Sequence, residues 1–114
     1  MSEQSEGGLT HSDRRALYIR AISITKAQSG DPQPLMAPRH TVKRLLSRIE
    51  DVDAAKSAIR AAVENGDLIS HRDRLAPTDD RERLVAIVEA AADETPPDRP
   101  LIGKCNRAMQ ALEG

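Results

Sequence analysis

A chain of 114 residues with 39% hydrophobic residues is long enough for a single domain with one modest core. Tyr18 is its only aromatic residue, so this core must be built from Leu, Ile, Val and Ala side chains. The net charge of −1 excludes a protein that binds nucleic acid through overall positive charge alone.

Residue types that mark catalytic or membrane proteins are scarce in this sequence. It has no glycine-rich phosphate loop, no paired cysteines of a metal site and no nucleophile elbow. No stretch is apolar enough to cross a bilayer, and the single cysteine, Cys105, excludes a disulfide within the chain. We therefore expect a cytoplasmic protein that is not an enzyme, with no metal, no cofactor and no membrane contact.

The N-terminal part is predicted to contain a tail and one helix. Residues 1–11 are predicted to be a disordered tail, because their Ser, Glu, Gln and Gly residues bury too little apolar surface. Ser12 is the predicted N-cap of a helix that continues to about residue 28. The alternation of β-branched residues over 22–25 leaves a strand as the alternative for that part.

Residues 38–65 are predicted to form two short helices joined by an acidic turn. The first helix has an apolar stripe at helical spacing, formed by Val42, Leu45, Leu46 and Ile49. Asp53 is the predicted N-cap of the second helix, which Gly66 ends. Before this pair, residues 29–34 are predicted to be a loop and residues 35–37 a short strand.

A β-hairpin is predicted over residues 67–77, with strands at 68–71 and 74–76 around Arg72 and Asp73. Helix, turn, helix and hairpin follow one another in PRHTVKRLLSRIEDVDAAKSAIRAAVENGDLISHRDRLAP. This order resembles the winged helix-turn-helix family of DNA-binding proteins, and in particular its small archaeal regulators. The resemblance implies an α+β, mostly helical fold, with a winged-helix domain over 12–92 and the strand at 35–37 paired with the wing. Because the turn lacks Gly and Asn, we expect it to be longer or less regular than usual.

Two further helices are predicted after the hairpin. Thr78 is the predicted N-cap of a fourth helix over 79–92, and residues 93–100 form a Pro-rich linker. An amphipathic helix is predicted over 101–114. Its apolar face and the first helix are predicted to contact a second copy or a protein partner, through Tyr18, Ile22, Leu101, Ile102, Cys105, Met109 and Leu112.

If the resemblance holds, it assigns DNA contacts to three surfaces. On the second helix of the pair, the residues implied to contact base edges are Lys56, Ser57 and Arg60. On the first helix, the residues implied to contact the DNA backbone are Arg39, His40, Lys43, Arg44 and Arg48. On the wing, they are His71, Arg72 and Arg74.

Charge along the sequence limits the expected affinity. Residues 1–37 have a net charge of 0, residues 38–77 of +2 and residues 78–114 of −3. We therefore expect a weak monomer that binds double-stranded DNA sequence-specifically as a homodimer on two half-sites, as a transcriptional regulator. The alternative is a winged-helix module for protein–protein interaction without DNA binding, for example in a plasmid or viral replication or transcription complex.

Overall fold

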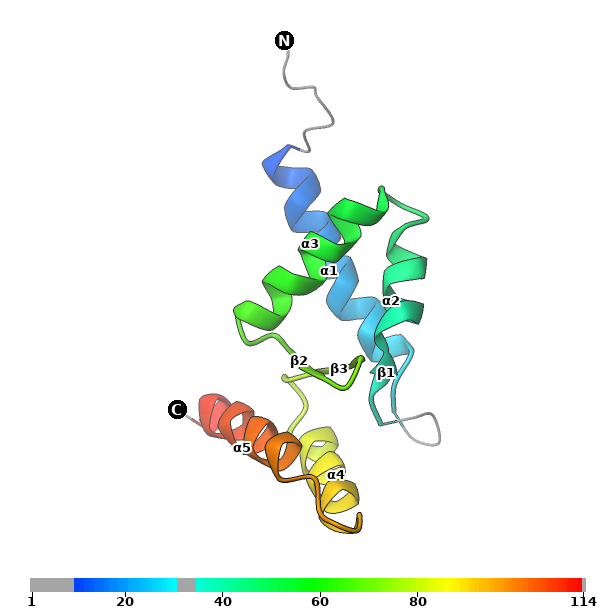
Figure 1. Cartoon of the computed structure of the whole chain (residues 1–114). Coiled ribbons are helices and arrows are strands. Elements are labelled where there is room, and N and C mark those ends of the chain that lie inside the picture. Colours follow the sequence, from blue (N-terminus) through cyan, green and yellow to red (C-terminus); the bar gives the residue numbers. More distant parts are fainter. Residues whose placement is uncertain (1–9, 31–34, 114) are drawn as a thin grey trace.

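The computed structural model describes residues 10–30 and 35–113 (Figure 1). Within these residues the fold is α+β and mostly helical, as predicted, with five helices and one small antiparallel sheet. The elements are α1 (His11–Ala27), β1 (Ala37–Pro38), α2 (Arg39–Leu46), α3 (Val52–Glu64), β2 (Leu68–His71), β3 (Arg74–Pro77), α4 (Arg81–Ala92) and α5 (Arg99–Glu113). None of the described helices is long and apolar enough to cross a membrane.

Helix α1 begins earlier than predicted. Its N-cap is Thr10, whose hydroxyl accepts a hydrogen bond from the Asp13 N–H at 3.0 Å, while the Asp13 carboxylate accepts one from the Thr10 N–H. This capping box satisfies two backbone donors at once, which Ser12 would not do, so the prediction of Ser12 as the cap is wrong. The rest of the predicted tail, like residues 31–34 of the predicted loop, lies outside the described residues. The strand alternative over 22–25 is wrong, since α1 continues through these residues.

Helices α2 and α3 are joined by a tight turn. The N-cap of α3 is Asp51, which accepts from the Ala54 N–H at 2.8 Å, and not Asp53, which lies in the first turn. Helix α2 ends at Leu46, and the Ile49 N–H then bonds the Leu46 carbonyl at 2.9 Å. This short i to i+3 bond turns the chain, so Ile49 is 50% exposed and does not continue the apolar stripe as predicted.

The sheet has the strand order β1-β3-β2, and both pairs are antiparallel. Strand β1 follows α1 and pairs with the hairpin, as predicted, although it is shifted toward α2. The hairpin turn has only two residues, Arg72 and Asp73, with φ of 49° and 59°. Both lie in the left-handed region, which Asp tolerates better than most residues. Because His71 pairs with Arg74, only two residues form the turn, and the prediction of a longer turn is wrong.

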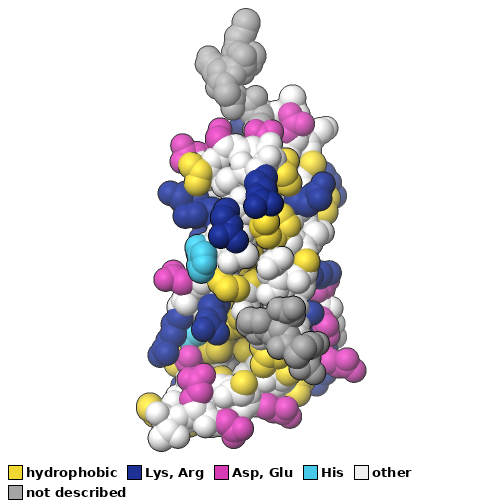
Figure 2. Space-filling model, turned by 90° about the vertical axis from the view of Figure 1, so that its right-hand side faces the viewer, with side chains coloured by type: hydrophobic (Ala, Val, Ile, Leu, Met, Phe, Trp, Pro, Cys, Tyr) yellow, Lys and Arg dark blue, Asp and Glu magenta, His cyan; other side chains and the backbone are white. Residues whose placement is uncertain are grey.

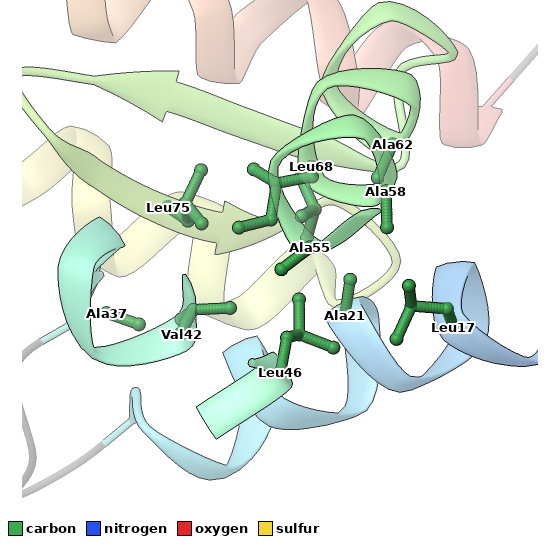
Figure 3. Close-up of a cluster of buried hydrophobic side chains, with 11 residues drawn as sticks. Leu17, Ala21, Ala37, Val42, Leu46, Ala55, Ala58, Ala62, Leu68 and Leu75 are labelled. Carbon is green, nitrogen blue, oxygen red and sulfur yellow. The ribbon is translucent and has the colours of Figure 1, made fainter. Parts of the chain in front are cut away.

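The two faces of the sheet belong to two hydrophobic clusters. Leu68 and Leu75 lie in the first cluster, with residues of α1, α2 and α3 (Figure 3). Their neighbours Ile69 and Ala76 lie in the second cluster, with residues of α4 and α5. This alternation places α1–α3 on one side of the sheet and α4–α5 on the other, as Figure 1 shows.

The C-terminal helices pack on the sheet and on each other. The N-cap of α4 is Asp80 and not Thr78, whose hydroxyl donates to the Gly66 carbonyl at 2.7 Å. Helix α5 begins at Arg99, so the non-helical linker is shorter than predicted. Pro100 lies in the first helical turn, where its missing N–H removes no helical hydrogen bond.

The face of α5 that is predicted to contact a partner packs largely against other parts of the same chain. Leu101 and Cys105 are buried in the second cluster, so the prediction that they contact a partner is wrong. Ile102 and Met109 are partly buried against the same cluster, and Leu112 is 46% exposed. Leu101 and Cys105 are buried because Ile69 and Ala76 make the second face of the sheet apolar as well.

Candidate nucleic-acid interface

Helix α3 presents two exposed cations on one flank. Its buried side consists of Ala55, Ala58, Ile59 and Ala62. Lys56 and Arg60 are exposed and lie one turn apart, so their side chains leave the helix in similar directions. Neither forms an ion pair with another described residue, so both are available to a ligand.

The third predicted base contact, Ser57, is exposed on α3 one helical turn before Arg60. It also lines a groove between α1 and α3 together with Ala54 and Ala61. Neither Lys56 nor Arg60 lines that groove. The structure therefore places Ser57 beside Arg60, at the boundary between the two cations and the groove.

Helix α2 adds further cations beside α3. His40, Arg44 and Arg48 are exposed and Lys43 is half-buried. Figure 2 views the molecule from the side of α2 and shows Lys and Arg side chains gathered over the upper half of this face. The guanidinium of Arg39, in contrast, donates from Nη1 to the Ser70 hydroxyl at 2.9 Å, so this side chain joins α2 to β2.

His71 does not project from the wing. Its side chain is 11% exposed, and Nε2 lies 2.8 Å from Oδ2 of Asp98, just before α5. The ammonium of Lys104 on α5 lies 3.4 Å from Nδ1 of the same ring and donates to the Ser70 carbonyl at 2.7 Å. These contacts remove His71 from the predicted wing contacts and hold β2 against α5.

Asp98 is the acidic centre of this cluster. Burial acts to raise the pKa of its carboxyl, but hydrogen bonds from His71 and the Leu101 N–H and the charge of Arg72 outweigh it. The pKa is therefore lowered below the ordinary value, and the carboxylate form is favoured. Sequence reasoning missed Asp98 and Lys104, since neither shows a local pattern and both lie about 30 residues from His71.

Arg72 and Arg74 remain the exposed cations of the wing. Both are exposed in the hairpin, although Arg72 Nε also lies 3.8 Å from Asp98 Oδ2. Carboxylates border the basic surface at the opposite end, where Glu50, Asp51 and Asp53 surround the start of α3. Phosphates would be repelled there, so the cations of α2, the middle of α3 and the wing are the groups suited to an anionic polymer.

Comparison with known proteins adds no relative. No family model, curated protein or solved structure matches this chain. Among residues 10–30 and 35–113, no group of three or more His, Cys, Asp and Glu side chains is arranged to hold a metal ion.

Proposed function

We propose that this chain is a winged helix-turn-helix protein that binds double-stranded DNA. Helices α2 and α3 would be the helix-turn-helix, and β2 and β3 the wing. The element order and the pairing of β1 with β3 support this assignment. The observation that carries the proposal is the exposed pair Lys56 and Arg60 on α3, beside Arg44 and Arg48 of α2, which are exposed and form no ion pair with a described residue.

Each basic surface has a distinct role in the proposed complex. Helix α3 lies in the major groove, where Lys56 and Arg60 donate hydrogen bonds to N7 and O6 of guanine. Arg44 and Arg48 contact phosphates, which fix the register without reading sequence. Arg72 and Arg74 contact the flanking backbone or minor groove.

The balance of charge predicts a modest number of phosphate contacts. Residues 38–77 have a net charge of only +2, and Glu64 ends α3 close to the proposed path of the DNA. A single copy would therefore bind weakly. We propose that a dimer on two half-sites gives the affinity and the sequence specificity of a transcriptional regulator.

Fluorescence anisotropy of a labelled random-sequence duplex, repeated over a series of salt concentrations, tests the proposal. We expect the logarithm of the binding constant to fall linearly with the logarithm of salt concentration, with a slope of a few units. The double variant Lys56→Ala/Arg60→Ala should bind more weakly than the parent. Arg107→Ala, which removes an exposed cation of α5, is the matched control and should bind as the parent does. No binding by the parent even at about 50 mM salt, where phosphate contacts are strongest, would overturn the proposal.

One observation favours a protein-interaction module as a second candidate. Ile49 and Val52 are exposed at the turn between α2 and α3, among Glu50, Asp51 and Asp53. Exposed apolar side chains next to carboxylates suit a protein partner better than a phosphate backbone. If DNA binding is absent, Ile49→Asp and Val52→Asp are the variants that test this surface for partner binding.

A further inference from the structure

An open groove separates the N-terminal half of α1 from α3. Its volume is about 950 Å³, and α3 contributes the small side chains Ala54, Ala58 and Ala61. Because alanine side chains are short, another helix could approach α3 closely along this line. Ile19 of α1 borders the same groove and is 52% exposed, so much of its apolar side chain is accessible to another molecule.

The two rims of the groove carry opposite charge. Arg14 and Arg15 line it on α1, and Asp51 and Asp53 line it at the start of α3. All four are exposed, and no ion pair between described residues joins the two rims. Asp51 also caps α3, but among the described residues none of these four side chains has an ionic partner, so a second molecule could pair with them.

We propose that this groove is the surface on which two copies of the chain associate. The N-terminal half of α1 from each copy lies in the groove of the other, with Ile19 against the alanines of α3. Arg14 and Arg15 of one copy then lie beside Asp51 and Asp53 of the other. A two-fold interface must be complementary to itself, and this surface carries both the projecting apolar side chain and the groove, and both signs of charge.

The proposed interface is compatible with DNA binding but does not rest on it. The groove is lined on α3 by Ala54, Ser57 and Ala61, and neither Lys56 nor Arg60 lines it. Association would therefore leave the two cations exposed on each copy. Association of two copies is measured without DNA, so a failure of the proposed interface can be distinguished from a failure of the proposed DNA binding.

Sedimentation velocity from micromolar to near-millimolar concentration tests the interface. We expect the parent to pass from monomer to dimer, and Ile19→Asp to raise the dimer Kd about tenfold or more. Val85→Asp is the matched control, because Val85 is an exposed apolar residue of α4 and lies outside the groove. The control should associate as the parent does. A parent that stays monomeric throughout, or an Ile19→Asp variant that associates as the parent does, would overturn the proposal.

Reversing the charges of Arg15 and Asp53 gives a second test. A folding defect in either variant would not be restored by mixing the two variants. Arg15→Glu and Asp53→Lys should each weaken association, since each places like charges together twice in the two-fold dimer. An equimolar mixture of the two variants should associate more strongly than either alone. In the mixed dimer the two reversed charges face each other on one side, and the native Arg15 faces the native Asp53 on the other. A mixture no more associated than its components would contradict the two-fold arrangement.

Discussion

The two helical layers on either side of the sheet use their charged side chains differently. In and around α4 and α5, ion pairs join Arg81 to Glu113 at 2.5 Å and Lys26 of α1 to Asp79 at 2.5 Å, and a hydrogen bond joins His71 to Asp98 at 2.8 Å. On α2 and α3, in contrast, none of the cations forms an ion pair with a described residue. Charged side chains around α4 and α5 thus mostly hold elements together, whereas those of α2 and α3, apart from Arg39, are mostly directed to solvent.

The largest expected effects come from the two clusters that the layers share with the sheet. Leu46 in the first cluster and Leu84 in the second are both fully buried. We expect Leu46→Ala and Leu84→Ala each to lower the free energy of unfolding by about 2–5 kcal/mol, through lost transfer energy and the cavity left behind. Urea denaturation followed by circular dichroism measures this. A single transition in both variants would show that the layers unfold together, and a second transition in either would show that they separate.

The next largest effects are expected on DNA binding, from the cations of α2 and α3 that form no ion pair with a described residue. Arg60→Ala should weaken binding to a selected site by about 1–3 kcal/mol, because it removes a contact to a base edge. Arg44→Ala should weaken binding about equally for all sequences and reduce the salt slope by about one unit, because it removes a phosphate contact. Anisotropy titrations with selected and random duplexes distinguish the two. An Arg60→Ala protein that discriminates among duplexes as the parent does would contradict the assignment of α3.

Acid should weaken the C-terminal layer through Asp98. Its pKa is lowered from the ordinary value of 3.8, so the folded state favours the carboxylate. This contribution to stability is complete above the ordinary pKa and is lost as pH falls through the lower folded value. We therefore expect Asp98→Asn, which keeps a capping side chain but has no charge, to lose less stability than the parent between about pH 5 and pH 2. Chemical denaturation across this pH range provides the measurement, and parallel losses in the two proteins would contradict the role of the carboxylate.

The smallest effect is expected for a surface pair of the same layer. Arg81 and Glu113 join α4 to the end of α5, but both side chains are more than half exposed. Glu113→Gln should therefore lower the free energy of unfolding by less than about 1 kcal/mol. Thermal unfolding at low and high salt measures this, and salt should reduce the difference between variant and parent. A larger loss would mean that the last turn of α5 depends on this pair.

Local patterns were sufficient to predict most of the elements. The apolar spacing of Val42 and Leu46 marked α2, and Gly66, which has a φ of 85°, marked the end of α3. The predicted N-caps of three helices were each wrong, and the observed caps are Thr10, Asp51 and Asp80. Each of these regions holds several residues that can cap a helix, and the backbone donors that each one reaches decide between them.

The features that could not be predicted depend on contacts between distant segments. His71 and Asp98 lie 27 residues apart, and no local spacing indicates their pairing. The burial of Leu101 and Cys105 depends on the second face of the sheet, which only the alternation along β2 and β3 creates. Which residues of α3 line the groove likewise depends on where α1 packs. The exposure of candidate residues on helix faces could be predicted from the sequence, whereas the tertiary contacts of Arg39 and His71 could not.

The hairpin turn has a consequence for the thermodynamics of recognition. The Asp73 carbonyl at the turn accepts a hydrogen bond from the Arg39 N–H at 2.8 Å, at the first residue of α2. The wing is thereby fastened to the helix whose cations are proposed to contact phosphates. The conformational entropy of ordering these two parts is then lost on folding and not on association, so a ligand that contacts both meets a preorganised surface.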